Sequence, residues 1–282
     1  MSKHTKQNDG KRRSVSEDYA RAVRKSSSSC CCSPEPRGVV AQLANYSDEE
    51  IAALPPEAMA SSFGCGNPLA LLDVQPGDVV LDLGCGAGID LLLAAKKVGH
   101  TAKVIGVDMT DAMIAKAREN IAAAGLTNVE VRKGIIEDLP VGDASIDLVI
   151  SNCVINLSPE KPRVFAEIAR VLKPGGRMLI SDIVVEDLPA EMTGNRRLYS
   201  SCLAGAITEK AYLDGLRKAG LEEAEVKDRL IYDIPQIEAL IGSELHEAGT
   251  GCCNGTGDAF AKHWAPRLQG KVASVKVAAR KP

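Results

Sequence analysis

The sequence predicts an α/β protein with a doubly wound, mostly parallel sheet and a smaller α+β appendage at its C-terminal end. Between residues 79 and 184, short apolar runs alternate with helical stretches of ten or more residues, a pattern typical of strand–helix–strand units. The chain has 282 residues, 45% of them hydrophobic, which is enough for the sizeable core of one large domain.

The expected elements follow from apolar periodicity and from the residues that interrupt it. Short apolar runs bounded by glycine or polar residues read as buried strands, and runs with a 3.6-residue period read as helices. The expected strands of the main sheet are 79–83, 103–108, 129–132, 145–151 and 177–184. The helices expected between them are 89–98, 111–124 and 160–172.

The pattern changes after Pro189. There the sequence predicts helices over 198–206 and 209–219, a strand over 222–227 and a final edge strand over 272–278. We therefore divide the chain into a mobile basic arm with a cysteine cluster, a cofactor-binding domain and a capping region. These parts are residues 1–45, 46–188 and 189–282.

Composition and charge exclude several classes of partner. The net charge of −3 argues against a general nucleic-acid binder, and aromatic residues make up only 3% of the chain. No apolar run approaches the eighteen or so residues of a membrane span, and the first residues lack the apolar segment of a secretory signal. We expect a cytoplasmic monomer with no nucleic-acid or membrane partner.

A glycine-rich loop lies between the first expected strand and the helix that follows it. Gly84, Gly86 and Gly88 allow the backbone to approach a ligand, and the helix start offers N–H groups. Asp108 ends the second strand 24 residues after Gly84, the position that binds ribose hydroxyls in nucleotide folds. With the KPGG turn before the fifth strand, these features resemble the class I S-adenosylmethionine methyltransferases over residues 74–185.

The resemblance assigns roles to the residues around the loop. It implies that S-adenosylmethionine is the cofactor and that Asp82, before the glycines, lies near its methionine part. It implies that Asp108, next to Met109, takes the ribose, and that the turn containing Ile136 and Glu137 lies by the adenine.

The chain has nine cysteines, an odd number, and no CxxC pair. This pattern does not fit a disulfide framework, a zinc ribbon or a thioredoxin motif, and leaves buried packing, soft-metal binding or redox chemistry. We interpret Cys85 as structural, because it occupies a small-residue position in a loop that works through its backbone.

Three cysteines on separate pieces of chain are expected to converge at the carboxyl ends of the strands, where doubly wound sheets bind ligands. Cys153 follows the fourth strand, Cys65 lies in the segment entering the first strand, and Cys202 is expected on a helix of the appended region. No general base is evident at this edge. Thiolates select soft acceptors such as trivalent arsenic, whose lone pair can attack a sulfonium methyl group without losing a proton.

Five motifs resemble the arsenite methyltransferases over about residues 46–206: FGCGNPLAL, LDLGCGAGID, GVDMTDAMIAKAREN, SNCVINL and LYSSCLAGA. The resemblance implies arsenic detoxification, with trivalent arsenic bound by Cys65, Cys153 and Cys202. It also implies an N-terminal cysteine that exchanges disulfides, and a thiol reductant such as thioredoxin or glutathione. Cys30–Cys32 compete for that role, with Cys32 as the candidate.

Two other functions stay open at this point. The first is methylation of a small organic acceptor, which predicts a base near the methyl group. The second is sequestration of a metalloid by thiols without catalysis, which leaves the cofactor loop unexplained. Cys252–Cys253 could deliver metalloid to the site or be an incidental loop feature, and its spacing from His246 and His263 fits no standard zinc pattern.

Overall fold

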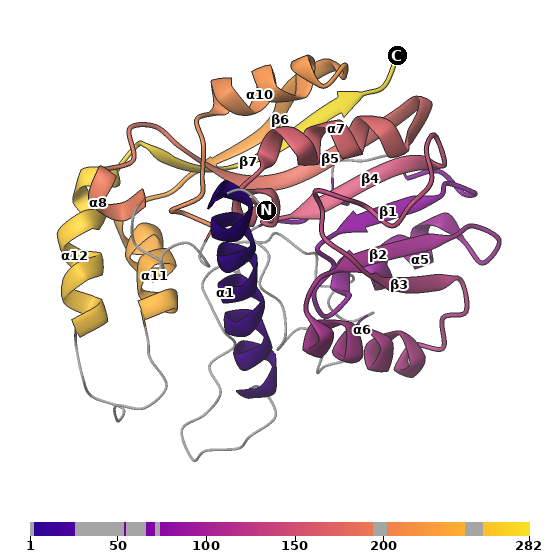
Figure 1. Ribbon diagram of the computed structural model, residues 1–282, viewed down its shortest axis with the longest axis horizontal. Coiled ribbons are helices and arrows are strands. Elements are labelled where there is room, and N and C mark those ends of the chain that lie inside the picture. Colours follow the sequence, from indigo (N-terminus) through magenta and orange to yellow (C-terminus); the bar gives the residue numbers. More distant parts are fainter. Residues whose placement is uncertain (1–2, 26–53, 55–65, 71–73, 194–201, 246–255) are drawn as a thin grey trace.

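The computed structural model describes residues 3–25, 54, 66–70, 74–193, 202–245 and 256–282. Over these ranges the chain forms one seven-stranded sheet with strand order β3-β2-β1-β4-β5-β7-β6 (Figure 1). The strands are β1 (Val80–Leu83), β2 (Val104–Asp108), β3 (Val129–Lys133), β4 (Ile146–Asn152), β5 (Leu172–Val185), β6 (Glu222–Ile231) and β7 (Val272–Arg280). All seven strands expected from the sequence are present.

The first five strands pair in parallel, and β7 runs antiparallel to both of its neighbours, β5 and β6. The expectation that residues 272–278 form an edge strand is therefore wrong. β7 lies inside the sheet, and β6 forms that edge. The burial pattern explains the position, because β7 is buried at nearly every residue and an edge strand would show one exposed face. The C-terminal region thus extends the main sheet.

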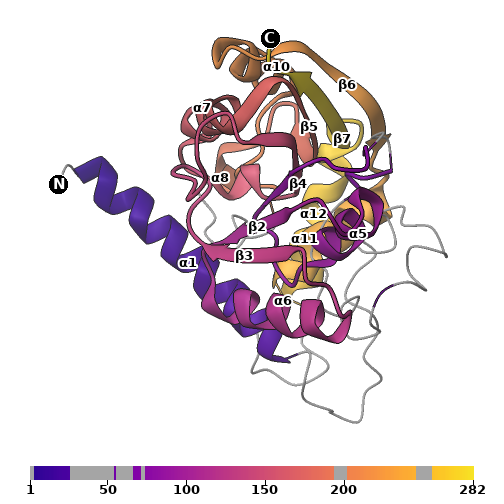
Figure 2. The same cartoon turned by 90° about the vertical axis from the view of Figure 1, so that its right-hand side faces the viewer.

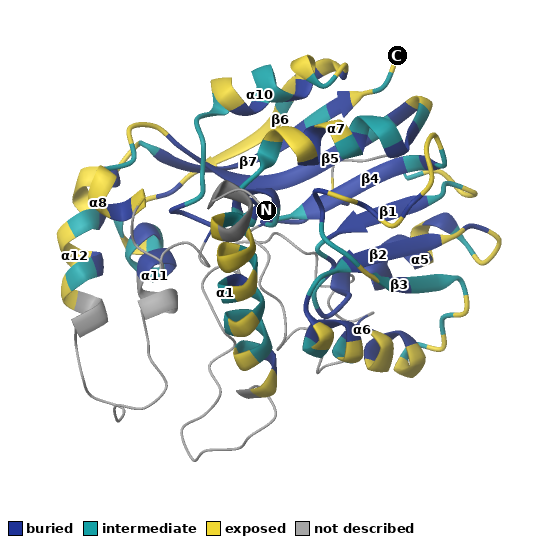
Figure 3. Ribbon diagram, viewed as in Figure 1, coloured by how far each residue is buried: buried dark blue, intermediate teal, exposed yellow. Residues whose placement is uncertain are grey.

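Helices cover both faces of the sheet (Figures 1 and 2). Side chains of α5 and α6 pack with β1 and β2 in one core, and side chains of α7 and α10 pack with β4 and β5 in another. Figure 3 shows that the central strands are buried along most of their length. A third core joins α11 and α12 to the ends of β5 and β7. The helices are α1 (Lys3–Lys25), α5 (Ile89–Val98), α6 (Asp111–Ala123), α7 (Lys161–Val171), α8 (Ala190–Thr193), α10 (Glu209–Lys218), α11 (Ile234–Leu245), α12 (Thr256–Leu268) and the short 3₁₀ helix η1 (Ile155–Leu157).

The N-terminal arm differs from the sequence prediction. Residues 3–25 form the long helix α1, which packs beside α6, whereas a largely mobile arm was expected (Figure 2). Val15 and Val23 on this helix are buried, at 2% and 8% exposure. With Tyr19 they recur every fourth residue, so one apolar stripe faces the protein.

The appended region also differs. The described part of the helix expected over 198–206 is a turn, because Cys202 has φ = 64°, which a right-handed helix cannot contain. Helices α11 and α12 were not predicted. No helix in the described part of the chain has the length and apolar character required to cross a membrane.

Candidate active site

The glycine loop after β1 has the backbone that its sequence predicts. Gly84, Gly86 and Gly88 have φ values of 65°, 50° and 88°, in the left-handed region that favours glycine. A Cβ atom at Gly84 would also lie 2.4 Å from the side chain of Val154. Asp108 fixes the loop, because its Oδ2 accepts a hydrogen bond from the Gly86 N–H at 3.0 Å.

This loop forms one side of a pocket at the carboxyl ends of β1, β2 and β4. All eight residues that the sequence analysis assigned to the cofactor line it. They are Asp82, Gly84, Gly86, Gly88, Asp108, Met109, Ile136 and Glu137. Cys153 lines the same pocket, so the two sites expected from the sequence adjoin.

The pocket is rich in carboxylates. Burial and repulsion from Asp90 and Asp108 raise the pKa of Asp82 well above its usual value. Burial also raises the pKa of Asp108, against the opposing effect of hydrogen bonds from the Thr110 and Gly86 N–H groups. Four acidic side chains, these three and Glu137, line the pocket. Such a lining favours a positively charged ligand and disfavours phosphate groups.

Cys153 and Cys202 lie together at the ends of β4 and β5. The Cys202 thiol donates to the Cys153 carbonyl, with 2.6 Å between sulfur and oxygen. Both residues are only 4% exposed, and both have left-handed backbones, with φ values of 59° and 64°. The Cys153 N–H donates to the carbonyl of Ser181 on β5 at 2.8 Å. Non-glycine residues rarely adopt this backbone, and those that do cluster at functional sites.

The oxidation state differs between these two cysteines. Cys153 is disulfide-bonded, and Cys202 is a thiol. The other candidate ligands, Cys65 and Cys32, lie outside the described residues, as do Cys30, Cys31, Cys252 and Cys253. The described residues contain no cluster of three or more His, Cys, Asp or Glu side chains that could hold a metal ion.

The residue after Cys65 is held at this site. Asn152, at the end of β4, donates to the Gly66 carbonyl at 2.5 Å and accepts from the Gly66 N–H at 3.2 Å. It also donates to Asp90 at 3.1 Å. The chain segment entering β1 is therefore tied to the residue that precedes Cys153.

Comparison with known proteins identifies the family. Residues 75–220 match the family model described as a methyltransferase domain. The crystal structure of an arsenic(III) S-adenosylmethionine methyltransferase from Chlamydomonas reinhardtii superposes with a TM-score of 0.65 and 34% identity, covering 82% of this chain and 71% of that one. The chain belongs to the arsenite methyltransferases, a branch of the class I methyltransferase family.

Two curated relatives support the same placement. The arsenite methyltransferase of Halobacterium salinarum is 46% identical over 197 residues, which cover 70% of this chain and 50% of that protein. The arsenite methyltransferase of Aquipseudomonas alcaligenes is 36% identical over 234 residues, covering 79% of this chain and 64% of that protein. The chain thus spans about half to two thirds of the length of these relatives.

Hydrogen bonds that the sequence analysis missed connect the loop after Cys153 to β5 and α7. Asn156, in η1, donates to Asp182 at 2.7 Å and to the Ile183 carbonyl at 2.6 Å. Lys161 donates to the carbonyls of Asn156 and Ser158, at 3.2 and 3.1 Å. These contacts hold the segment from Cys153 to Ser158 in place.

Two residues of this hydrogen-bond network titrate near neutral pH. Burial raises the pKa of Asp182 to about 7, although backbone hydrogen bonds and the charge of Lys161 oppose the rise. Burial lowers the pKa of Lys161 to about 8, against the attraction of Asp182. Asp182 shares a face of β5 with Ile180 and Val184, which pack with α10, whereas Ile183 packs with the two cysteines. Because side chains alternate along a strand, Asp182 supports the loop from the far side of the sheet.

Cys85 differs from the other two described cysteines. Its thiol packs against Gly106 of β2, where an added Cβ would lie 2.7 Å from the sulfur. Burial, then repulsion from Asp82 and Asp108, raises the pKa of the Cys85 thiol well above its usual value. A thiol that stays protonated is a poor nucleophile and a poor metal ligand, which agrees with a structural role.

Sequence reasoning missed further residues that line the pocket in this family member. They are Asp90, Thr110, Asn152 and Ser158 on the domain, and Arg12, Val15 and Tyr19 on α1. The sequence could have indicated Asp90, because it is an acidic residue in the first turn of the helix that follows the glycine loop. It could also have indicated Asn152, which directly precedes Cys153 after a buried strand.

Proposed function

We propose that this protein transfers methyl groups from S-adenosylmethionine to trivalent arsenic held by cysteine thiolates. The observation that carries the proposal is the position of Cys153, which lines the acid-rich pocket and also contacts Cys202. A substrate bound to these sulfurs lies next to whatever occupies the pocket. This proximity is what a direct transfer between two bound molecules requires.

The pocket suits S-adenosylmethionine on chemical grounds. The cofactor carries two cationic groups, an ammonium and a sulfonium, and the buried carboxyl groups of Asp82, Asp90 and Asp108 complement them. When bound, it supplies an electrophilic methyl group. We assign Asp108, with Met109, to the ribose and the Ile136–Glu137 turn to the adenine, as the family resemblance implies.

The thiols bind and orient the substrate. We propose that arsenite exchanges its hydroxides for sulfur bonds to Cys153, Cys202 and Cys65, which lies one residue before the anchored Gly66. Thiolates suit this soft centre, and three sulfur bonds leave the arsenic lone pair available for attack. Positioning that lone pair toward the pocket requires no general base.

A reductant is needed between transfers. Arsenic that gains a methyl group is formally oxidised from the trivalent to the pentavalent state, and two thiols must supply two electrons as they join in a disulfide. We propose that Cys32, or a neighbour in the 30–32 cluster, takes part in this exchange, with thioredoxin or glutathione as the external thiol.

We also propose that the protein is a cytoplasmic monomer. Among the described residues the large hydrophobic side chains left exposed are Leu230 and Ile231, both on the edge strand β6. Two neighbouring side chains are a small patch for a stable dimer interface. Light scattering coupled to size exclusion would measure the mass directly.

One incubation tests the proposed function. The protein is mixed with arsenite, S-adenosylmethionine and glutathione, and arsenic species are separated and quantified, with Asp108→Ala as the matched cofactor-site control. Methylarsenicals from the wild type, strongly reduced in the control, are expected. Arsenic binding without any methylated product would instead indicate sequestration. Methyl transfer to an added organic acceptor but not to arsenite would indicate the other alternative.

A further inference from the structure

Helix α1 forms part of the pocket wall, although it lies outside the 75–220 range that matches the family model. Arg12, Val15 and Tyr19 all line the pocket, and they follow one another at the three- and four-residue spacing that places side chains on one face of a helix. Val15 is only 2% exposed, so this face of the helix is packed against the domain.

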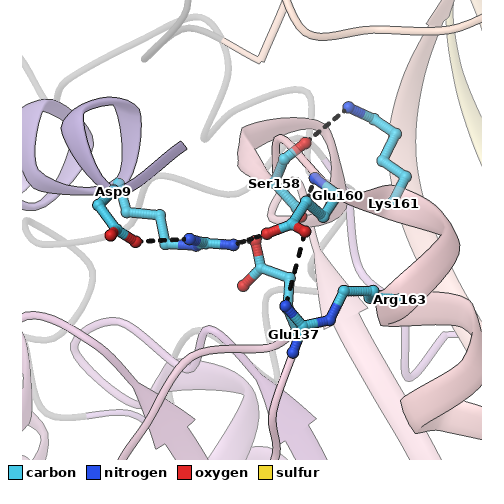
Figure 4. A network of polar contacts seen from close by, with 7 residues as sticks. Asp9, Glu137, Ser158, Glu160, Lys161 and Arg163 are labelled. Carbon is cyan, nitrogen blue, oxygen red and sulfur yellow. Dashed lines mark hydrogen bonds and ion pairs between the residues drawn. The ribbon is translucent and has the colours of Figure 1, made fainter. Parts of the chain in front are cut away.

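Arg12 ties the helix to two acidic residues of the domain. Its Nε donates to Glu137 at 3.1 Å, and a terminal nitrogen donates to Glu160. Figure 4 labels these two acids together with Asp9 of α1. A second terminal nitrogen donates to Asp9, one turn earlier in α1, at 3.1 Å. Burial lowers the pKa of Arg12, but the hydrogen bonds to Glu160 and Glu137 outweigh it and the pKa is raised. The cation is therefore held by charge-assisted hydrogen bonds.

The partners of α1 follow three different strands. Thr110, after β2, donates to Ser16 at 3.1 Å. Glu137, after β3, is 3% exposed and also accepts from the Ser158 hydroxyl at 2.6 Å. Glu160 directly precedes α7. The helix thus spans the carboxyl ends of the strands that form the pocket.

We infer that α1 is a wall of the cofactor site and that Arg12 is a positioning residue that slows cofactor release. The inference rests on the proposed function in one respect, the identity of the occupant. Without the Arg12 guanidinium, α1 loses its contacts with Glu137 and Glu160. The buried Glu137 carboxylate then has no guanidinium to offset its negative charge. The helix then separates from the pocket more often, and a bound cofactor escapes faster.

The test measures release of S-adenosylmethionine and of its demethylated product from the full chain by stopped-flow displacement. Arg12→Ala should raise the dissociation rate constant by about tenfold or more, the effect of losing one charge-assisted hydrogen bond. Arg12→Lys should restore part of the loss. Arg13→Ala is the matched control, because the Arg13 side chain is 82% exposed and its ion pair is with Glu17 on the same helix. It should stay within about twofold of the wild type.

Glu160→Gln guards against a variant that merely misfolds, because it weakens one contact of Arg12 from a charged to a neutral hydrogen bond without changing α1 or the buried Glu137. It should raise the release rate in the same direction, and Arg12→Ala should add less in that background than alone. Equal release rates in Arg12→Ala and Arg13→Ala would overturn the inference about Arg12. That result would not contradict the proposed methylation of arsenite. A wild type that binds no cofactor would overturn the proposed function and this inference together.

Discussion

Buried cysteines occur both in the glycine loop after β1 and at the carboxyl ends of β4 and β5, but their surroundings differ. Cys85 in the loop is 8% exposed, and Cys153 and Cys202 at the strand ends are each 4% exposed. Burial alone does not separate them. The backbone does, because Cys153 and Cys202 have positive φ values and the loop instead places its positive φ values on glycines.

The difference shows where each region carries its function. In the loop the backbone approaches the ligand, and glycine supplies the conformation without strain. At the carboxyl ends of β4 and β5, Cys153 and Cys202 occupy a backbone conformation that glycine would fit better, which agrees with the proposal that their side chains bind the substrate. A strained non-glycine residue beside a pocket is therefore a stronger indication of function than a buried thiol.

The largest expected effect comes from the two cysteines at the strand ends. Cys153→Ser and Cys202→Ser should each lower methylation of both arsenite and methylarsonous acid by at least about 100-fold, because a hydroxyl is a harder and far less acidic ligand. Product speciation with each substrate measures this. Retention of either activity by Cys202→Ser would show that the contact with Cys153 has no role in catalysis.

Cys65 should affect the two substrates unequally. Arsenite can form three sulfur bonds, whereas methylarsonous acid can form only two, and we assign these two to Cys153 and Cys202. Cys65→Ser should therefore abolish methylation of arsenite and retain part of the methylation of methylarsonous acid. The same speciation assay decides, and an equal loss of both activities would contradict the assignment of an inner pair.

Asp108→Ala tests the role of the glycine loop after β1 in binding the cofactor. The carboxylate holds the Gly86 N–H and is assigned to the ribose, so its loss should weaken S-adenosylmethionine binding by roughly 10- to 100-fold. Arsenite binding should stay largely unchanged. Calorimetry of both ligands gives the answer, and an unchanged cofactor dissociation constant would count against the assignment.

The free energy of unfolding should depend on pH through Asp182, which hydrogen-bonds to Asn156 beneath the Cys153 loop. The pKa of Asp182 is raised to about 7 by burial, so between about pH 4 and 7 the folded protein keeps a proton that the unfolded chain releases. The free energy of unfolding should fall across this window as pH rises, and Asp182→Asn should lack that contribution. Denaturant unfolding at several pH values measures the difference between the two proteins, expected on the order of a few kcal/mol. Parallel curves for wild type and variant would refute the pKa assignment.

The smallest effect is expected at Cys85. Cys85→Ala removes a thiol that packs against Gly106, and a small residue at this position leaves the loop backbone free to act as before. The variant should retain substantial methylation, within about threefold of the wild type, with a stability loss of about 1 kcal/mol from the lost packing. Normal cofactor binding combined with no methylation would show that Cys85 binds arsenic after all.

The sequence was sufficient for the main sheet and the pocket because those features are local. Buried parallel strands appear as apolar runs, and the glycines that require positive φ follow the first run directly. The eight residues assigned to the cofactor therefore all line one pocket, and their contacts with the cofactor stay predictions. The turn at Cys202 was missed because its apolar neighbours fit a helical period, and local pattern cannot reveal a single left-handed residue.

Other features depend on contacts between distant parts of the chain. The stripe of Val15, Tyr19 and Val23 was visible, but one narrow stripe in a basic, polar segment does not indicate what it packs against. Asp182 reads as an ordinary acid inside a strand until Asn156 and Tyr212 are placed beside it. The roles proposed for Cys32, Cys65 and the other cysteines outside the described residues stay predictions.

The contact between α1 and residues far along the chain has a consequence for folding during protein synthesis. Arg12 is made before its partners Glu137 and Glu160, which lie 125 and 148 residues further along the chain. At typical elongation rates the ribosome needs roughly 7 to 30 seconds to add them. During that interval Arg12 lacks both of these partners, so we expect the helix to dock in its final position late, once Glu137 and Glu160 have been made.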